Sequence, residues 1–273
     1  MRHFFCLILC LCLSFPVNSQ SSSSPYKTDV WKDGAWITAG LGLNVAGVLL
    51  IQNKDELTEA DIAAIDKDDI WAIDRWAAGN SSKRADELSY IPFYTSFALP
   101  LLFLAGEDER SNFGQISVLF VETMATTGAL FTLTAGAVQR SRPLVYNESL
   151  PMGERTDSDA QRSFFAGHTA ATAAATFFTA KVFQDFNPDS PALPYVWTGA
   201  AVIPAFVGYL RMEGGKHFIS DNLVGLGIGA ACGILIPEIH KTKNESVSLY
   251  PTAQFNLNGT GINSRGIGVS YSF

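Results

Sequence analysis

The sequence predicts an all-α protein, a bundle of six helices associated with a membrane, with a short C-terminal β-hairpin. Three observations lead to this fold class. Hydrophobic residues make up 47% of the 273 residues, and the mean hydropathy of +0.15 lies above that of most soluble enzymes. Six apolar stretches follow one another after residue 34, several of them long enough to cross a bilayer. Residues 246–273 instead alternate apolar with small or polar residues, as β-strands do.

The first 19 residues have the composition of a secretory signal peptide. Arg2 provides a basic start, an apolar run extends from Phe4 to Phe15, and small or polar residues follow up to Ser19. This run is too short to cross a bilayer comfortably, so we expect cleavage after it and a linker over residues 20–34. Cleavage would leave Cys232 as the one cysteine, so no intramolecular disulfide is expected.

Residues 35–245 are expected to form the helical domain. Its six apolar stretches are residues 35–51, 91–105, 116–138, 164–183, 192–210 and 219–237. The second stretch is short and is broken by Pro100, which makes it the one that we expect not to span a membrane. In the last stretch Gly225, Gly229 and Gly233 recur at every fourth position and share one helical face, where another helix can approach closely.

Two further segments complete the chain. Residues 53–77 are highly charged, yet their isoleucines and Trp76 recur at near-helical spacing, which predicts an amphipathic helix on the bundle or at the membrane surface. Residues 246–273 are expected to form a β-hairpin that turns at Asn258-Gly259. The formal net charge of -7 offers no basic surface for nucleic acid, so nucleic-acid binding is excluded. The sequence leaves the oligomeric state open.

Three short clusters of polar residues lie where a long apolar helix begins or ends. They are GAVQRSRP ending at Pro143, SFFAGHTA starting at Ser163, and LRMEGGKHFISD ending at Asp221. If the helices between them run alternately up and down, all three clusters lie on the same side of the bundle. We therefore expect them to form one site.

The third cluster contains a candidate nucleophile. His217 and Asp221 are four residues apart and can share a helical face, where the carboxylate would hold one imidazole nitrogen and leave the other unprotonated. Glycines at 214 and 215 allow the backbone to turn between Arg211 and His217. His240, at the opposite end of the last stretch, is interpreted as a solvated helix terminus.

The other functional candidates indicate an anion as the bound group. Arg142 and Arg211 carry planar guanidinium groups that suit tetrahedral oxyanions, so phosphate is the expected group. His168 follows Gly167 at the start of a helix, where backbone N–H groups also point at anions, and is placed to act as general acid. No set of metal ligands is evident, and no cofactor is expected.

These residues resemble the type 2 phosphatidic acid phosphatase superfamily, which includes lipid phosphatases, bacterial acid phosphatases and vanadium haloperoxidases. The resemblance covers about Phe120 to Pro237, and the family's motifs have the form K-x6-R-P, P-S-G-H and S-R-x5-H-x3-D. Arg142-Pro143, Gly167-His168, and Arg211 with His217 and Asp221 match them in order and internal spacing. The resemblance implies a helical bundle in which His217 forms a phosphohistidine, Asp221 orients it, and His168 protonates the leaving oxygen. Arg142, Arg211 and the Gly167 amide would hold the phosphoryl oxygens.

Four positions depart from these motifs. Ala135 replaces the lysine, Phe165 and Ala166 replace the proline and serine, and Leu210 replaces the serine before Arg211. Arg140 or Lys216 is expected to supply the missing positive charge. Because the nucleophile, the orienting acid, the proton donor and both arginines are retained, we expect an active enzyme.

The resemblance implies a phosphoric monoester hydrolase that acts on a lipid phosphate or pyrophosphate, such as phosphatidate, phosphatidylglycerol phosphate, undecaprenyl pyrophosphate or lipid A. Two alternatives stay open: a catalytically impaired protein that binds lipid phosphate, and a vanadate-dependent haloperoxidase, against which the missing lysine and the small size argue. We expect the inner membrane of a bacterial cell envelope, with the active site facing the periplasm. That orientation requires one of the first two apolar stretches not to span, or the whole bundle to be a periplasmic globule.

Overall fold

The computed structural model describes residues 24–242, 247–255 and 262–271. Inter-residue contacts divide the chain into two compact units, residues 1–240 and residues 241–273. The predicted signal peptide lies outside the described residues, as do residues 20–23 of the predicted linker. The end of that linker was predicted wrongly, because helix α2 (Val30–Gln52) already begins at Val30.

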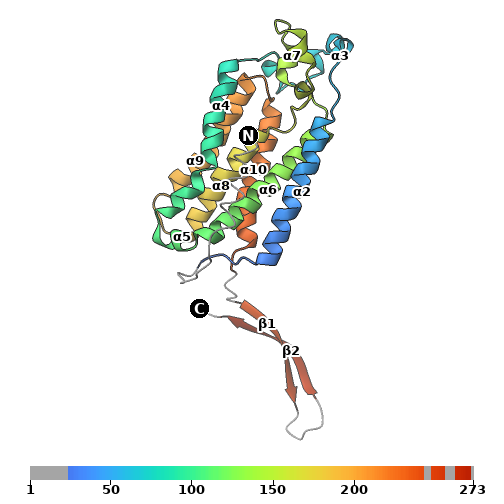
Figure 1. The fold of residues 1–273 in the computed structure, drawn as a ribbon. Coiled ribbons are helices and arrows are strands. Elements are labelled where there is room, and N and C mark those ends of the chain that lie inside the picture. The colour runs from blue at the N-terminus through green and yellow to red at the C-terminus, as the bar shows by residue number, and fades with distance from the viewer. Residues whose placement is uncertain (1–23, 243–246, 256–261, 272–273) are drawn as a thin grey trace. The chain divides into compact units, whose positions relative to one another are not determined.

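The first unit is a bundle of long helices that coincide with the six apolar stretches (Figure 1). They are α2 (Val30–Gln52), α4 (Lys83–Ser96) continued by the 3-10 helix η3 (Leu99–Leu104), α6 (Phe113–Ala137), α8 (Gly167–Phe186), α9 (Leu193–Glu213) and α10 (Ile219–Ile239). The short helix α5 (Glu107–Ser111) leads into α6. The predicted helical bundle is therefore confirmed.

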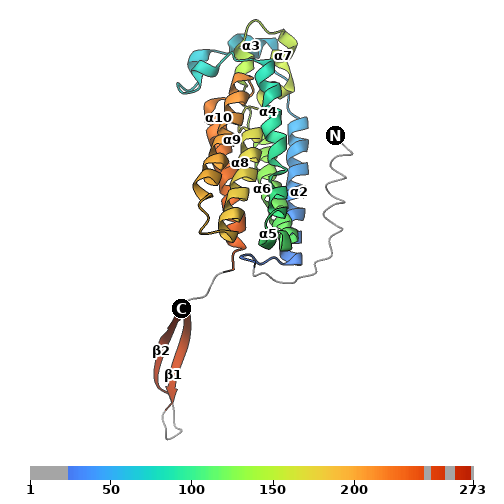
Figure 2. The same cartoon turned by 90° about the vertical axis from the view of Figure 1, so that its left-hand side faces the viewer.

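Helix α8 is the centre of the bundle, because α4, α6, α9 and α10 all contact it (Figures 1 and 2). The glycine face of α10 packs on it as predicted. A Cβ atom added to Gly229 would lie 2.1 Å from the carbonyl oxygen of Ala170, and one added to Gly233 would lie 2.6 Å from that of Ala174. Any larger residue would force the two backbones apart, so these glycines set the distance between α8 and α10.

Five helical segments are long and apolar enough to cross a membrane: α2, Lys83–Leu104, α6, α9 and α10. The outer surface of α2 is apolar, since Trp36, Leu43, Val45 and Leu49 are all exposed. A surface of this kind suits contact with lipid, and the chain is an integral membrane protein. The second apolar stretch is longer than the sequence predicted, because its helix begins at Lys83, where Ser82 caps it, and η3 extends it past Pro100.

Residues 53–77 do not form the single amphipathic helix that the sequence predicted. They form α3 (Glu59–Ala64) and two 3-10 helices, η1 (Lys67–Asp69) and η2 (Arg75–Ala77). Aspartates end the helical run because their side chains bond local backbone amides, as Asp66 does with the amide of Asp68 at 2.9 Å. Ile62 and Ile70 are buried in two different clusters, the first with Val145 and the second with Phe218.

Short helices cover one end of the bundle. They are α3, α7 (Met152–Thr156), η4 (Pro143–Tyr146) and η5 (Ser158–Gln161), and Figure 2 shows α3 and α7 together there. In the second unit β1 (Val247–Phe255) pairs with β2 (Ile262–Tyr271) in antiparallel register, from Val247 opposite Tyr271. The predicted Asn258-Gly259 turn lies outside the described residues.

Candidate active site

The three clusters come together, as predicted, at one end of the bundle. Backbone hydrogen bonds join them in pairs: Ser163 N–H to Arg140 O at 3.1 Å, Ala166 N–H to Asp221 O at 3.1 Å, and Leu144 N–H to Gly215 O at 3.1 Å. Gly215 makes the turn from α9 to α10 possible. Its φ of +69° is a conformation that other residues rarely adopt, and a Cβ atom there would lie 2.0 Å from the carbonyl oxygen of Asn80.

His217 is buried in the short connection between α9 and α10, with 2% of its surface exposed. Its Nδ1 lies 2.5 Å from the backbone carbonyl oxygen of Ser163. A carbonyl oxygen can only accept a hydrogen bond, so Nδ1 carries the proton and Nε2 is left with a free lone pair. Burial, together with the positive charges of Arg211 and Arg142, lowers the pKa of His217 well below its ordinary value. The imidazole is therefore neutral at neutral pH, with a lone pair available on Nε2.

Asp221 does not hold His217, which corrects the prediction made from their spacing. The helical spacing does not apply, because α10 begins at Ile219, after His217. The carboxylate of Asp221 is fully buried and accepts hydrogen bonds from the Ser163 hydroxyl at 2.5 Å and from the Phe218 amide at 2.8 Å. Asp221 therefore fixes Ser163, whose backbone carbonyl oxygen fixes His217.

Arg140 does not lie free for phosphate, which corrects a second prediction. Its guanidinium forms ion pairs with Asp221 and, at 2.8 Å, with Asp74, and it donates to the Ser220 hydroxyl at 3.0 Å. Asp74 is fully buried and also accepts from the Ser220 amide at 3.0 Å. The sequence did not indicate Asp74, because it lies in the segment that was interpreted as a surface helix. Arg140 is a partner of two buried carboxylates and supports the acid that holds Ser163.

Arg142 and Arg211 are both buried, with 7% and 3% of their surfaces exposed. Arg142 forms an ion pair with Asp159, and Arg211 forms one with Asp86 of α4. Among the described residues, Nε of each arginine has no hydrogen-bond partner, so each keeps a buried donor for a further acceptor. Burial, then Arg211 and Arg162, lower the pKa of Arg142 to about 9, which leaves the guanidinium charged at neutral pH. Two buried guanidinium groups that each keep an Nε donor favour the binding of an anion.

His168 is the second residue of α8, and its ring is enclosed by two aromatic rings of α4. The ring centroids of Phe93 and Tyr90 lie 4.2 Å and 4.9 Å from that of His168. Burial, followed by the charges of Arg211, Arg142 and Lys216, lowers the pKa of His168 to about 3. Its Nε2 is buried and has no hydrogen-bond partner among the described residues. The positive charges of Arg211 and Arg142 thus act on both His168 and His217. A bound phosphate dianion would raise the pKa of His168.

Gly167 opens α8 and is required there by packing. A Cβ atom at Gly167 would lie 2.6 Å from the ring of Phe131. The amides of the first helical turn have no partner within the helix, so the amide of Gly167 can donate to an anion.

Two lysines add positive charge where the motif lysine is missing. Ala135 itself is fully buried in α6. The Nζ of Lys216 lies 3.5 Å from Asp86. Burial first, and then the positive charges of Arg142 and Arg211, lower the pKa of Lys216, which indicates that both arginines are close to it. Lys54, which the sequence did not indicate, donates from Nζ to the carbonyl oxygens of Val138 at 2.6 Å and Gln161 at 2.9 Å.

Helix α4 supplies a wall of the site that the sequence analysis missed. Asp86 pairs with Arg211, and Tyr90 and Phe93 enclose His168. These three residues recur at positions i, i+4 and i+7, so they share one helical face. This spacing could have indicated the helical face from the sequence. It was missed because Asp86 and Tyr90 precede the apolar stretch that was used to predict the helix.

Comparison with known proteins bears on the same region. Residues 117–245 match the model of the PAP2 superfamily. The chain is also similar to the crystal structure of the first transmembrane PAP2 type phosphatidylglycerolphosphate phosphatase from Bacillus subtilis, with 21% identity and a TM-score of 0.45 over 77% of this chain and 96% of that one. No curated protein matches the chain. The matched residues include all three clusters of the site, and this region, residues 117–245, belongs to the PAP2 superfamily.

Proposed function

We propose that this protein is a phosphatase that removes phosphate from a membrane lipid phosphate or pyrophosphate through a phosphohistidine at His217. One observation carries the proposal. A buried, neutral imidazole with a free Nε2 lies among two buried arginines and a second histidine whose Nε2 is buried. Phosphoryl transfer requires a nucleophile, a group that passes a proton to the leaving oxygen, and fixed positive charge for the equatorial oxygens. His217, His168 and the two arginines could supply these functions, which supports the proposal.

In the first step, Nε2 of His217 attacks the phosphorus atom and the bond between phosphorus and the leaving oxygen breaks. His168, at the start of α8, takes the proton of the monoanionic phosphoryl group and passes it to that oxygen. In the second step, water gives a proton to His168 and attacks the phosphohistidine. The P–N bond breaks, its electron pair returns to Nε2 of His217, and inorganic phosphate leaves. Arg142 and Arg211 hold the phosphoryl oxygens through both steps, and the carbonyl oxygen of Ser163 keeps the proton of His217 on Nδ1.

The surroundings of His168 favour a lipid as the substrate. The helix that encloses this histidine is α4, and the outer surface of α4 and of η3, which continues it, is apolar. Ile91 and Tyr94 of α4 are 61% and 59% exposed, and Leu102 of η3 is 64% exposed. A lipid could keep its acyl chains against this surface while its phosphate reaches the arginines. A small soluble phosphoester would make no use of such a surface.

A protein that binds lipid phosphate without turnover is the second candidate. Ala135 and Ala166 favour it, because both are fully buried at positions where the family's motifs have a lysine and a serine. Arg140 does not compensate for them, since it pairs with Asp74 and Asp221. Lys216 is the cation that we propose takes over.

Phosphate release by the detergent-purified chain separates the two candidates. The substrates are phosphatidate, phosphatidylglycerol phosphate, undecaprenyl pyrophosphate and lipid A, each compared with a soluble phosphoester. Wild-type protein is expected to release phosphate from at least one lipid, and His217→Ala is expected to release none. Ser117→Ala, which removes a hydroxyl bonded only within α6, is the control and is expected to retain activity. Binding without release by folded wild-type protein would favour the second candidate.

For its location, we propose the inner membrane of a bacterial cell envelope. The expectation from the sequence that the site faces the periplasm loses its basis, because both of the first two apolar stretches are long and apolar enough to span. Labelling of single cysteines introduced beside the site, with a reagent that does not cross the inner membrane, tests this orientation in whole cells. Cys232 is buried and is replaced first.

A further inference from the structure

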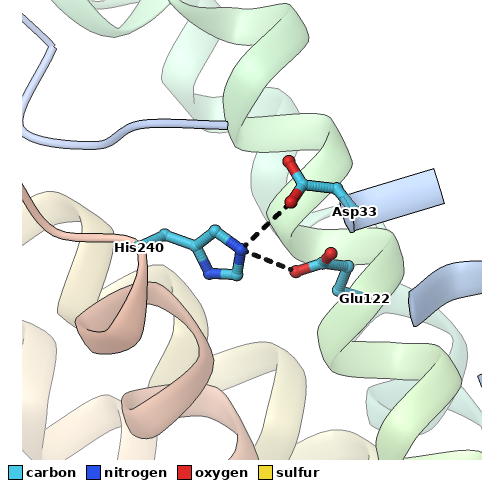
Figure 3. Close-up of side chains that lie close together, drawn as sticks. All are labelled: Asp33, Glu122 and His240. Atoms are coloured by element: carbon cyan, nitrogen blue, oxygen red, sulfur yellow. Dashed lines mark ion pairs between the residues drawn. The ribbon is translucent and has the colours of Figure 1, made fainter. Parts of the chain in front are cut away.

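At the end of the bundle away from the candidate active site, three ionisable side chains come from three different helices or helix ends. Asp33 lies in the first turn of α2, Glu122 lies in α6, and His240 caps the C-terminus of α10. One ligand atom from each lies within 4.8 Å of the others. Figure 3 shows the imidazole of His240 pointing at both carboxylates. His240 is not the solvated helix terminus that the sequence suggested, because only 12% of its side chain is exposed.

Hydrogen bonding fixes which nitrogen of His240 faces the carboxylates. Nδ1 lies 2.8 Å from the backbone carbonyl oxygen of Ile236, so Nδ1 carries a proton and donates it there. Nε2 is then the atom that lies 3.5 Å from Asp33 Oδ1 and 3.4 Å from Glu122 Oε2. In the neutral imidazole this nitrogen presents a lone pair to two carboxyl groups.

Glu122 independently indicates that a ligand belongs here. Its side chain is completely buried, and neither Oε1 nor Oε2 has a hydrogen-bond partner among the described residues. A buried carboxylate without such partners is costly unless a cation neutralises it. Asp33 is also buried and uses Oδ2 to accept the Asp29 amide at 2.7 Å, which leaves Oδ1 for the cluster.

The distances suit a metal ion better than a direct ion pair. Charged N–H···O hydrogen bonds are about 2.7–2.9 Å long, and the single proton on Nε2 cannot serve two carboxylates at once. In a tetrahedral site with metal–ligand distances of about 2.1 Å, neighbouring ligand atoms lie about 3.4 Å apart. The separations of 3.4 Å and 3.5 Å from Nε2 match that edge.

We propose that Asp33, Glu122 and His240 bind one divalent transition-metal ion that joins α2, α6 and α10. An imidazole with two carboxylates suits ions such as Zn²⁺, whereas Mg²⁺ and Ca²⁺ prefer sites made of oxygen alone. The site lies apart from the phosphate cluster and donates no group to it. Its role is to fasten the start of α2 to the rest of the bundle.

The test measures Zn²⁺ binding by the full chain in detergent after treatment with a chelator. Titration calorimetry and elemental analysis are expected to give one Zn²⁺ per chain. Glu122→Gln, which keeps the shape of the side chain, is expected to weaken binding at least about tenfold. Glu238→Gln is the matched control, because Glu238 lies at the same end of α10 but pairs with Lys181. It should bind Zn²⁺ as wild type does.

Two further measurements keep the outcome interpretable. His217→Ala should bind Zn²⁺ with unchanged affinity, which separates this site from adventitious binding at the other histidines. If Glu122→Gln does not fold, His240→Gln replaces it, with the visible spectrum of bound Co²⁺ reporting the loss of a nitrogen ligand. The proposal is overturned if wild-type protein binds no Zn²⁺, or if binding survives in both Glu122→Gln and His240→Gln.

Discussion

His217 donates its Nδ1 proton to the backbone carbonyl oxygen of Ser163, and the hydroxyl of the same serine donates to Asp221. Asp221 therefore contacts His217, the proposed nucleophile, only through an intervening residue. Asp221 is itself held by Arg140, which is held in turn by Asp74. The contacts thus run from Asp74 through Arg140, Asp221 and Ser163 to His217. They hold the Ser163 carbonyl oxygen in place, and that oxygen keeps the proton of His217 on Nδ1.

Ser163→Ala tests this relay. The substitution keeps the backbone carbonyl oxygen that accepts from His217 but removes the hydroxyl that ties Ser163 to Asp221. We expect kcat to fall roughly tenfold, which corresponds to about 1.4 kcal/mol, with little change in KM. Steady-state phosphate release measures both constants. Ser117→Ala, which removes a hydroxyl bonded only within α6, is the control. An unchanged kcat in Ser163→Ala would mean that Asp221 does not act through this residue.

The two arginines of the RSRP segment are expected to differ. Arg142 keeps a donor for phosphate, whereas Arg140 serves Asp74 and Asp221. Arg142→Ala should weaken competitive inhibition by inorganic phosphate roughly 10- to 100-fold, because it removes charged hydrogen bonds. Arg140→Lys should leave the inhibition constant almost unchanged and lower kcat. Equal weakening in the two variants would place Arg140 in the phosphate site and contradict this assignment.

The pH profile follows from the two histidines. A lowered histidine pKa favours the neutral form, so His217 stays a nucleophile throughout the ordinary pH range. His168, with a pKa of about 3, is also neutral in the free enzyme, so the proton for the leaving oxygen must arrive with a monoanionic phosphoryl group. The second pKa of a phosphate monoester is about 6, so kcat/KM should fall about tenfold per pH unit above that value. A loss of kcat/KM as the pH falls through about 6.5, the ordinary histidine pKa, would contradict the conclusion that both histidines are neutral.

Two glycines of α10 give a matched test of the helix packing. A Cβ atom at Gly229 would lie 2.1 Å from the carbonyl oxygen of Ala170, whereas one at Gly227 meets nothing within 4 Å. Gly229→Ala should lower the free energy of unfolding by about 1–3 kcal/mol, because α10 must move away from α8. Gly227→Ala should be neutral or slightly stabilising. Thermal unfolding in detergent measures the difference, and equal midpoints would show that this close approach does not matter.

The sequence predicted the helices well because their signal is local. Long apolar runs can satisfy their backbone polar groups only as helices in a membrane, so the six stretches were recognisable one at a time. The spacing of Gly225, Gly229 and Gly233 likewise indicated a packed face without reference to its partner. The ends of the helices were harder to predict. Helix α4 begins at Lys83, in a charged region where hydropathy gives no sign of a helix.

The details of the site depend on contacts between distant segments, and these could not be predicted. Asp221 and His217 are close in sequence, yet the acceptor for His217 is the backbone of Ser163, and no side-chain pattern reveals a backbone carbonyl. Arg140 was assigned to phosphate because its partner Asp74 comes from another part of the chain. The cluster of Asp33, Glu122 and His240 was missed for the same reason.

The central claim, a phosphohistidine at His217, is tested most directly by trapping that intermediate. Wild-type, His168→Ala and His217→Ala proteins are mixed with a radiolabelled lipid phosphate, quenched in alkali and digested for mass spectrometry. Phosphohistidine is stable in alkali and labile in acid, so we expect an acid-labile label on the peptide that contains His217. The label should accumulate in His168→Ala if His168 also helps activate water, and it should be absent from His217→Ala. Phosphate release by wild-type protein without this label, or a label that persists in His217→Ala, would contradict the account.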